Sequence, residues 1–499
     1  RLSFKTINKL PLWRIEDKNM RKDKSAKLLE WLREGQELSM RQQLLLIVHL
    51  SIPAIFAQIS SIIMEYIDAS MVGCLGANAS ASIGLVASST WLLGGLTSAY
   101  NTGFSVQIAH RIGAGDGKGA RRIMKQGLIT ALLYSLILLS VGAGISRELP
   151  RWLGGDSSIC REAFHYFLVY SLALPIMQMN LAAGAMLQSS GNMRLPSILH
   201  VLMCFLDILF NLVLIFPSRS VLWMGHQMYI PGMGLGVLGA ALGTALAQLV
   251  IMICMMYFLL FRSPALHLRK EEKLQFYRKD IRKAIGISVP VAVEQFIMSG
   301  AQIMSTRIVA PLGMIAIAAN SFSITAESLC YMPGYGIGSA ATTLIGQSVG
   351  AGRHDLTKRL GWIATCFGML VMAVSGACMY LLAPWMISIL SPDEAIRQLG
   401  ASVLRIEAFA EPMYAASIVA SGVFRGAGDT LIPSCLNFCS MWLVRLPLAA
   451  FLAPKFGLRG VWIAMCIELC IRGVLFLLRL AFSKNWDQTD KRHRGKLLT

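Results

Sequence analysis

Charged residues are scarce in this chain: 15% of its 499 residues are Asp, Glu, Lys or Arg, against about a quarter in soluble proteins. The mean hydropathy is +0.57. Apolar runs of about 20 residues, the length that crosses a bilayer as a helix, recur from one end of the chain to the other. This composition excludes a soluble enzyme, a secreted disulfide scaffold and a disordered chain, and it predicts an integral membrane protein.

Several patterns that would indicate other chemistry are also missing. The eleven cysteines include no CxxC pair and no Cys/His cluster, so we interpret them as small packing residues. Residues 1–43 lack the short apolar core of a secretory signal. No GxxxxGK[ST] phosphate-binding loop is present, so ATP is not expected as an energy source.

Acidic residues are outnumbered by basic ones, 27 to 46, which gives a net charge of +19. Most basic residues lie in the tails and in the connections on one side of the expected membrane, so the positive-inside rule places both termini in the cytoplasm. This topology explains the charge without nucleic acid as a partner. The twelve expected spans are residues 44–73, 79–107, 122–146, 163–189, 195–216, 234–261, 284–310, 314–345, 359–390, 398–424, 431–453 and 457–482.

The chain contains an internal repeat. An offset of 237 residues aligns Pro53 with Pro290, and it also aligns residues 113–115 with 350–352, both Gly-Ala-Gly. Further along, the offset falls to 221, which indicates a 16-residue insertion around 217–232 on the extracytoplasmic side. Repeated halves of this kind enclose a cavity that can open to either side, which is typical of a transporter. A channel is the less common use of such a duplication.

The expected fold is therefore all-α and integral to the membrane, with twelve transmembrane helices in two pseudo-symmetric six-helix lobes around a central cavity. The expected divisions are a basic and partly disordered cytoplasmic N-terminal segment (1–43), an N-terminal lobe (44–261), a cytoplasmic linker (262–283), a C-terminal lobe (284–482) and a basic cytoplasmic tail (483–499).

Four stretches, at 60–76, 112–122, 344–355 and 409–434, resemble the multidrug and toxic compound extrusion (MATE) family. The resemblance covers about residues 44–482, and the Arg-Gly-x-Gly-Asp-Thr element at 425–430 is among its sharpest parts. Within the family, the chain resembles the bacterial DinF-like branch more than the NorM-like or eukaryotic branch.

The resemblance implies a secondary antiporter, not an enzyme, that exports small organic compounds, typically cations, by alternating access. Na+ or H+ would be the coupling ion, and no other cofactor is implied. We expect a monomer that spans the cytoplasmic (inner) membrane many times and contacts lipid. The alternative is a flippase of the same superfamily for lipids or lipid-linked oligosaccharides.

Acids within spans are costly and therefore indicate function. By resemblance, Asp68 occupies the first-helix position that the family uses for cation binding, and Asp207 and Asn211 occupy, in swapped order, a fifth-helix pair of the DinF-like branch. The i, i+4 spacing puts Asp207 and Asn211 on one helix face, and Glu65 shares much of the face of Asp68. We predict these four as ion-coupling residues, with Asp68 and Asp207 as candidate Na+ ligands.

A substrate cavity is predicted from Glu294, Gln295, Glu411, Tyr66 and Tyr331. Glu294 and Glu411 lie on helices that resemble those carrying acids in NorM-like and eukaryotic members, although each is about one turn out of register. Tyrosine faces suit flat cations.

The arginines within the spans need partners as well. Glu468 and Arg472, spaced i, i+4, predict an ion pair on a helix surface. Arg307 and Arg445 are expected either to pair with acids inside the membrane or to contact substrate.

Overall fold

The computed structural model describes residues 24–223, 226–269, 272 and 275–483. The partly disordered N-terminal segment expected at 1–43 is described only from residue 24, and of the basic tail expected at 483–499 only residue 483 is described. Residues 24–33 form helix α3 (Lys24–Arg33), which packs on the bundle through Leu28, Leu29 and Leu32. Ser483 ends the described chain.

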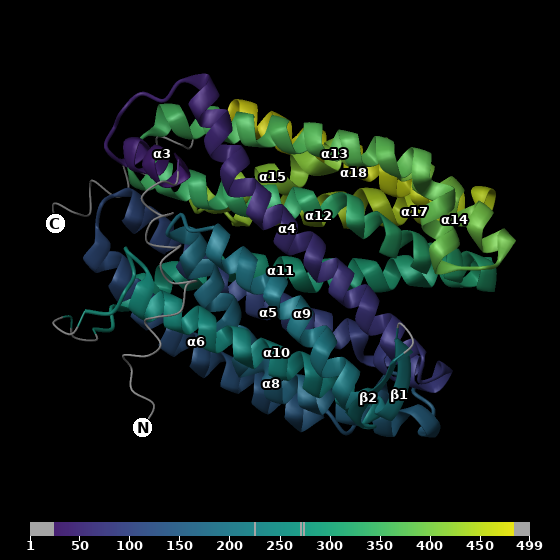
Figure 1. Cartoon of the computed structure of the whole chain (residues 1–499). Coiled ribbons are helices and arrows are strands. Elements are labelled where there is room, and N and C mark those ends of the chain that lie inside the picture. Colours follow the sequence, from purple (N-terminus) through teal and green to yellow (C-terminus); the bar gives the residue numbers. More distant parts are fainter. Residues whose placement is uncertain (1–23, 224–225, 270–271, 273–274, 484–499) are drawn as a thin grey trace, which may run out of the picture.

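Long helices form most of the rest of the described chain (Figure 1) because a chain in lipid must satisfy its backbone hydrogen bonds internally. The N-terminal half contains α4 (Met40–Gly73), α5 (Ala77–Gly113), α6 (Gly117–Ile145), α7 (Leu149–Trp152), α8 (Ser157–Ser189), α9 (Arg194–Leu214), α10 (Gly236–Tyr257) and the π-helical turn η1 (Phe258–Arg262). The C-terminal half contains α11 (Arg278–Val309), η2 (Ala310–Leu312), α12 (Met314–Gly350), α13 (His354–Leu390), α14 (Glu394–Glu407), α15 (Glu411–Ala427), α16 (Leu431–Cys439), η3 (Ser440–Arg445), α17 (Leu446–Phe456) and α18 (Leu458–Phe482).

Local sequence sets where several of these helices begin. Ser39 and Gln42 form a reciprocal capping box at the start of α4, and the Asp116 side chain accepts a 2.8 Å hydrogen bond from the backbone N–H of Gly119 at the start of α6. Gly76 and Gly313 precede α5 and α12 with φ of 108° and 100°, a backbone region that glycine enters at little cost.

Ten helices of the described chain are long and apolar enough to cross a membrane. Two predicted spans are not among them. Residues 314–345 lie in α12, which is long enough but less apolar, and residues 398–424 are divided between α14 and α15 by a break at 408–410. Twelve crossings therefore remain a prediction.

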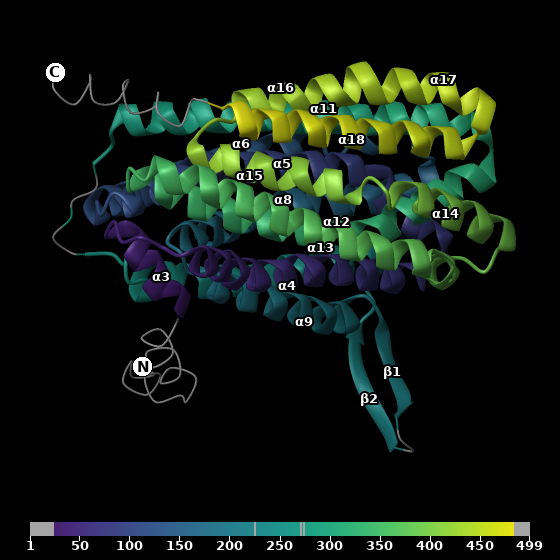
Figure 2. The same ribbon diagram turned by 90° about the horizontal axis from the view of Figure 1, so that it is seen from above.

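The expectation of a purely helical fold is wrong at one place. The insertion predicted at 217–232 forms a two-stranded antiparallel hairpin, β1 (Pro217–Trp223) and β2 (His226–Met233), in which Trp223 pairs with His226. Figure 2 shows the hairpin projecting from the bundle.

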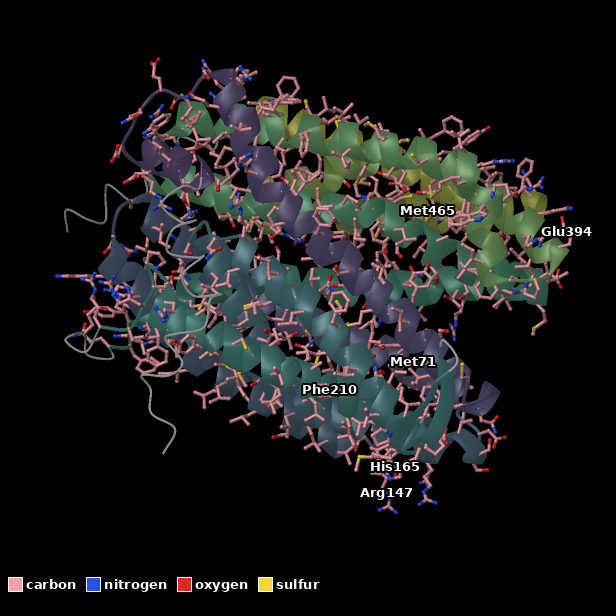
Figure 3. All side chains as sticks on the ribbon, viewed as in Figure 1. Met71, Arg147, His165, Phe210, Glu394 and Met465 are labelled. Carbon is pink, nitrogen blue, oxygen red and sulfur yellow. The ribbon has the colours of Figure 1, made fainter. Side chains whose placement is uncertain are left out.

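The bundle has two distinct ends. We call the end at which α3 lies the α3 end, and the opposite end, from which β1 and β2 project, the hairpin end (Figure 1). Arg147 and Glu394 lie at the hairpin end, whereas Phe210 and Met465 lie between the two ends (Figure 3).

The two halves contact each other through their first two long helices. Helix α4 packs along α12, and α11 packs along α5, so the first long helix of each half lies against the second long helix of the other. Glycine permits this close approach: a Cβ at Gly336 would lie 2.7 Å from the backbone nitrogen of Ile55, and one at Gly103 would lie 2.9 Å from the carbonyl carbon of Ala284. The result is a long seam between the halves.

Candidate functional site: a cavity between the halves

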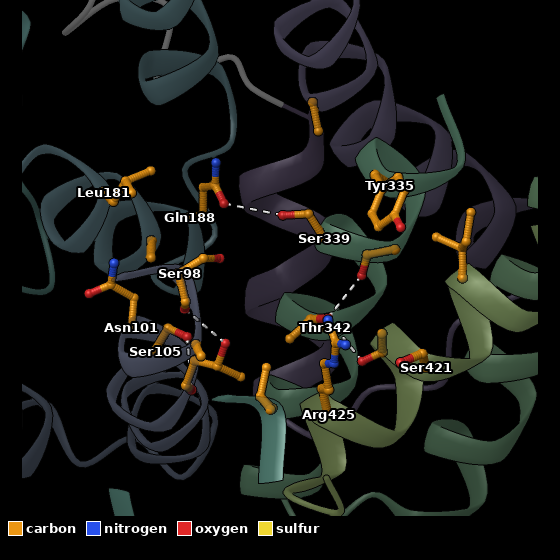
Figure 4. Close-up of a pocket in the computed structure, with 18 of the residues that line it drawn as sticks. Ser98, Asn101, Ser105, Leu181, Gln188, Tyr335, Ser339, Thr342, Ser421 and Arg425 are labelled. Atoms are coloured by element: carbon orange, nitrogen blue, oxygen red, sulfur yellow. Dashed lines mark hydrogen bonds between the residues drawn. The ribbon is translucent and has the colours of Figure 1, made fainter. Parts of the chain in front are cut away.

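A cavity of about 630 Å³ lies in this seam, which is the size of a pocket for a drug-sized molecule. Both halves line it, and many of the lining side chains are neutral and polar. Figure 4 shows Ser98 and Asn101 on one wall, opposite Ser339 and Thr342 on the other. Gln188 joins the two walls, since the Ser339 hydroxyl donates to its side-chain oxygen at 3.2 Å.

One carboxylate in the wall is fully engaged. Glu294 on α11 accepts hydrogen bonds from Asn437 at 2.6 Å and Ser434 at 2.7 Å, both on α16. The Nη2 group of Arg425 on α15 donates to both carboxylate oxygens at 3.3 Å. The Glu294 side chain is 4% exposed and that of Arg425 is 29% exposed. The carboxylate is therefore enclosed and neutralised, while the guanidinium reaches the cavity (Figure 4).

A second arginine in the wall, Arg472 on α18, is also paired. Its Nε lies 3.1 Å from Oε1 of Glu468, and the Ser440 hydroxyl donates to that same oxygen at 2.5 Å. The ion pair predicted from the spacing is confirmed, but its predicted place on a helix surface is wrong. Both side chains are buried, because this face of α18 packs against α15 and η3.

Hydrogen bonds join the two halves toward the α3 end. Gln347 on α12 donates to the backbone carbonyl of Ser189 at 2.8 Å, and it accepts from the Arg33 side chain at 3.0 Å. The His110 ring lies 2.8 Å from the carbonyl oxygen of Gly426. These contacts fasten the α3 end of the seam.

Three of the predicted ion-coupling residues lie together in the N-terminal half. The side-chain nitrogen of Asn211 on α9 donates to Asp68 on α4 at 2.8 Å and to Asp207 on α9 at 3.1 Å. Asp207 and Asn211 are fully buried, and the Asn211 side-chain oxygen has no donor among the described residues. Carboxylate and amide oxygens of this kind suit a hard cation. Glu65 is exposed and lies outside this hydrogen-bonded group.

The C-terminal half buries a second group of acids. Glu327 on α12, Glu407 at the end of α14 and Glu411 at the start of α15 are each at most 5% exposed. Neither carboxylate oxygen of Glu407 or Glu411 has a hydrogen-bond donor within the described chain. Arg445 on η3 lies close enough to Glu327 and Glu407 for the charges to attract one another, but in the described chain it forms no direct ion pair with either acid. The side chain of Arg307 is exposed instead.

The remaining predicted cavity residues lie at different depths. Glu294 and Gln295 are in the cavity wall, whereas Tyr66, Tyr331 and Glu411 are outside the set of residues that lines it. Tyr331 lies behind that wall, edge-on to the rings of Tyr335 and Tyr414 at 6.0 and 5.6 Å, and both of those tyrosines do line the cavity.

The sequence did not single out Arg425, Ser434 or Asn437 as functional residues. Arg425 was visible as part of the Arg-Gly-x-Gly-Asp-Thr element, but its carboxylate partner is 131 residues away on another helix. Only the packing of α11 against α16, with α15 close by, reveals that these side chains surround Glu294.

Comparison with known proteins identifies the family. The MatE profile matches residues 53–213 and 290–451. The chain belongs to the MatE family. It is a membrane transporter and not an enzyme, and its two matches begin at the proline pair that the internal repeat aligns.

Curated relatives of this MatE chain carry the name "Probable multidrug resistance protein NorM". The protein from Thermotoga maritima is 28% identical over 450 residues, covering 89% of this chain and 93% of the relative. The protein from Chromobacterium violaceum is 24% identical over 454 residues, covering 87% and 93%.

Solved structures with the same fold include "Crystal structure of MATE in complex with MaL6", with a TM-score of 0.82. They also include "Outward-facing conformation of a multidrug resistance MATE family transporter of the MOP superfamily", with a TM-score of 0.81. Each is 21% identical and covers 91% of this chain and 98% of its own. These likenesses establish the MATE fold.

Proposed function

We propose that this MatE transporter is a secondary antiporter that exports small organic compounds across the cytoplasmic membrane in exchange for Na+ or H+. Asp68, Asp207 and Asn211 would hold the coupling ion, and the cavity between the halves would hold the substrate. The observation that carries the proposal is the separation of these two features: a polar cavity shared by both halves and a buried group of two acids and an amide within one half.

Two acids bound by one amide nitrogen favour ion exchange for an electrostatic reason. Two negative charges in a buried site repel each other, and a proton or a metal cation relieves that repulsion. When the ion leaves, the acids lose their compensation, and the helices α4 and α9 that carry them favour a different spacing. Because α4 also packs along α12 of the other half, a shift of α4 would reach the cavity.

We further propose that α12 and the α14–α15 pair also cross the membrane, giving twelve crossings in two lobes, with the chain divided at about residues 44, 262, 284 and 483. The α3 end, which carries many of the basic connections, would then face the cytoplasm. The hydrogen bonds of Gln347, Arg33 and His110 would close the cavity on the cytoplasmic side. Assignment to the DinF-like branch stays a prediction.

The test is transport by the purified chain in proteoliposomes. Export of a fluorescent organic compound would be followed under an imposed Na+ gradient and, separately, under an H+ gradient, for the unchanged protein and for Asp68→Asn. We expect one gradient to drive export in the unchanged protein and neither to do so in the variant. Normal coupled export by Asp68→Asn would overturn the assignment of the ion site. Failure of both gradients with every organic probe, followed by movement of a labelled lipid-linked sugar, would favour a flippase.

A further inference from the structure

The charge that the cavity presents to a substrate is positive. Among the residues that line it, Glu294 is the acid, and Arg425 and Arg472 are the strong bases. Glu294 already receives two hydrogen bonds at each of its oxygens, from Arg425, Ser434 and Asn437. A carboxylate accepts through about four lone-pair sites, so a cationic substrate would find no free acceptor on this side chain.

The guanidinium of Arg425 is in the opposite situation. It carries five N–H donors, and in the described chain only Nη2 has acceptors, both of them oxygens of Glu294. The N–H groups on Nε and Nη1 therefore have no acceptor among the described residues. The side chain that carries them is 29% exposed and lies in the cavity wall (Figure 4), so a bound molecule can supply the acceptors. Both two-donor edges of the guanidinium include Nη2, which contacts Glu294, so the groups on Nε and Nη1 can donate separately, each to one oxygen of a carboxylate, sulfonate or phosphate group.

Arg472 does not offer comparable free donors to the cavity. Its side chain is 6% exposed, its Nε faces Glu468 on the same helix, and its guanidinium lies 5.3 Å from the centre of the Tyr414 ring. Enclosure by these groups leaves Arg425 as the better-placed cation for a bound molecule.

We propose that the cavity recognises its substrates through an anionic oxygen group that accepts from the free N–H groups on Nε or Nη1 of Arg425, so that anionic and zwitterionic compounds are preferred over simple cations. In this arrangement Glu294 is a positioning residue. It holds the guanidinium in place from behind, and Ser434 and Asn437 in turn hold Glu294. This inference rests on the proposed function only in using the same cavity, and it can be tested by binding alone.

Two variants separate the binding role of Arg425 from the positioning role of Glu294. Glu294→Gln keeps the size of the side chain and removes its charge, so Arg425 loses its counter-charge and should bind anionic groups more tightly, by about 10-fold. A cation-binding role of Glu294 predicts the reverse, a loss of cation affinity. The double variant Glu294→Gln with Arg425→Gln removes both charges together, leaves no buried carboxylate unpaired, and should lose the anionic preference. Glu394→Gln, at an exposed acid of the hairpin end, is the matched control for the loss of one negative charge.

The probes would share one naphthalene scaffold and carry a sulfonate, a trimethylammonium group, or both. Binding to the purified full chain in detergent would be measured by fluorescence, with the melting temperature as the check on folding. We expect the unchanged protein to bind the sulfonate and the zwitterion at least about 10-fold more tightly than the cation, with a further gain in Glu294→Gln and a loss in the double variant.

Three results would overturn the inference. The cation could bind best and weaken in Glu294→Gln, the double variant could keep the anionic preference, or the folded protein could bind none of the three probes. Gradient-driven export in proteoliposomes separates this inference from the proposed function. Binding of the anionic probe without gradient-driven export would contradict the antiporter and leave this inference standing. Gradient-driven export of the cationic probe alone would support the antiporter and contradict this inference.

Discussion

Replacement of Asp207 by asparagine is the sharpest perturbation of the proposed ion site. Asp207 is fully buried on α9 and shares the side-chain nitrogen of Asn211 with Asp68. The change preserves the size and shape of the side chain and removes one of the two negative charges. It therefore tests electrostatics with little disturbance of packing.

The magnitude follows from the two hydrogen bonds. Because Asp68 and Asp207 contact the same nitrogen at 2.8 and 3.1 Å, the two contacting oxygens are at most about 6 Å apart. At an effective dielectric constant of about 20, two unit charges at this distance interact by about 3 kcal/mol. A monovalent cation held near both acids loses an attraction of about that size when one acid is neutralised. We expect its affinity to fall by about 100-fold.

Two measurements would check this: the dependence of export on the concentration of the coupling ion in proteoliposomes, and the binding of that ion to purified protein by calorimetry. Glu162→Gln is the matched control, because Glu162 is an exposed acid near the start of α8 and outside the predicted ion site, and we expect a change below threefold. An Asp207→Asn protein with an unchanged ion dependence would refute the reasoning. So would an equal loss in the Glu162→Gln control.

Three further predictions concern contacts outside the proposed ion site. Replacing Arg33 by glutamine removes a hydrogen-bonded cation that bridges the two halves, so backbone hydrogen exchange at 189–193 should rise, and unchanged exchange would contradict this role for α3. Glu272→Gln should cost about 1.5–3 kcal/mol, because its carboxylate accepts from Arg121 at 2.5 to 3.0 Å and this bond lowers the pKa of Glu272. The pair stabilises the unchanged protein above the peptide pKa of about 4.3 and stops doing so as the pH falls through the lower folded-state pKa, so the melting temperatures of the unchanged protein and of Glu272→Gln should converge only in acid. Gly336→Ala should lower the melting temperature, since overpacking against backbone costs about 1–3 kcal/mol, whereas Gly84→Ala, where a Cβ meets nothing within 4 Å, should not.

Much of the scaffold could be predicted because the constraint on it is simple. A lipid-embedded chain needs long apolar helices, and these are visible as runs of residues. The hairpin at 217–233 was found as an insertion, because it breaks the offset between the repeats, but its strands were not predicted. The break at 408–410 was also missed, since a three-residue interruption in a long apolar run leaves too little signal in composition.

The site was less predictable because its contacts cross between helices. The face shared by Asp207 and Asn211 follows from helical spacing alone, and the place of Asp68 beside them came from the family resemblance. Neither helical spacing nor the family resemblance predicted the environment of Glu294. Its charge suggested a group that meets cations, but four hydrogen bonds from α15 and α16 neutralise it, and no single-helix pattern could reveal those donors.

The repeat extends to single backbone contacts at the α3 end. A Cβ at Gly113 would collide with the backbone of Gln347, and a Cβ at Gly350 would collide with the backbone of His110. Each glycine and each partner is 237 residues from its counterpart, so α5 and α12 cross at equivalent points. Close backbone approach requires glycine in both copies. The side chains at the crossing carry no such requirement, and they differ.

Charged groups have diverged between the halves in the same way, and this bears on how ion and substrate could be coupled. The acid–amide group of Asp68 lies in the N-terminal half, and the charged wall of the cavity, formed by Glu294, Arg425 and Arg472, belongs to the C-terminal half. An ion bound by the first group has no need to touch a substrate bound by the second. Coupling would instead act through the seam, where α4 packs along α12 and α5 along α11. The glycine contact kept in both repeats holds α5 closely against α12, so a helix shift in one half would be passed to the wall contributed by the other.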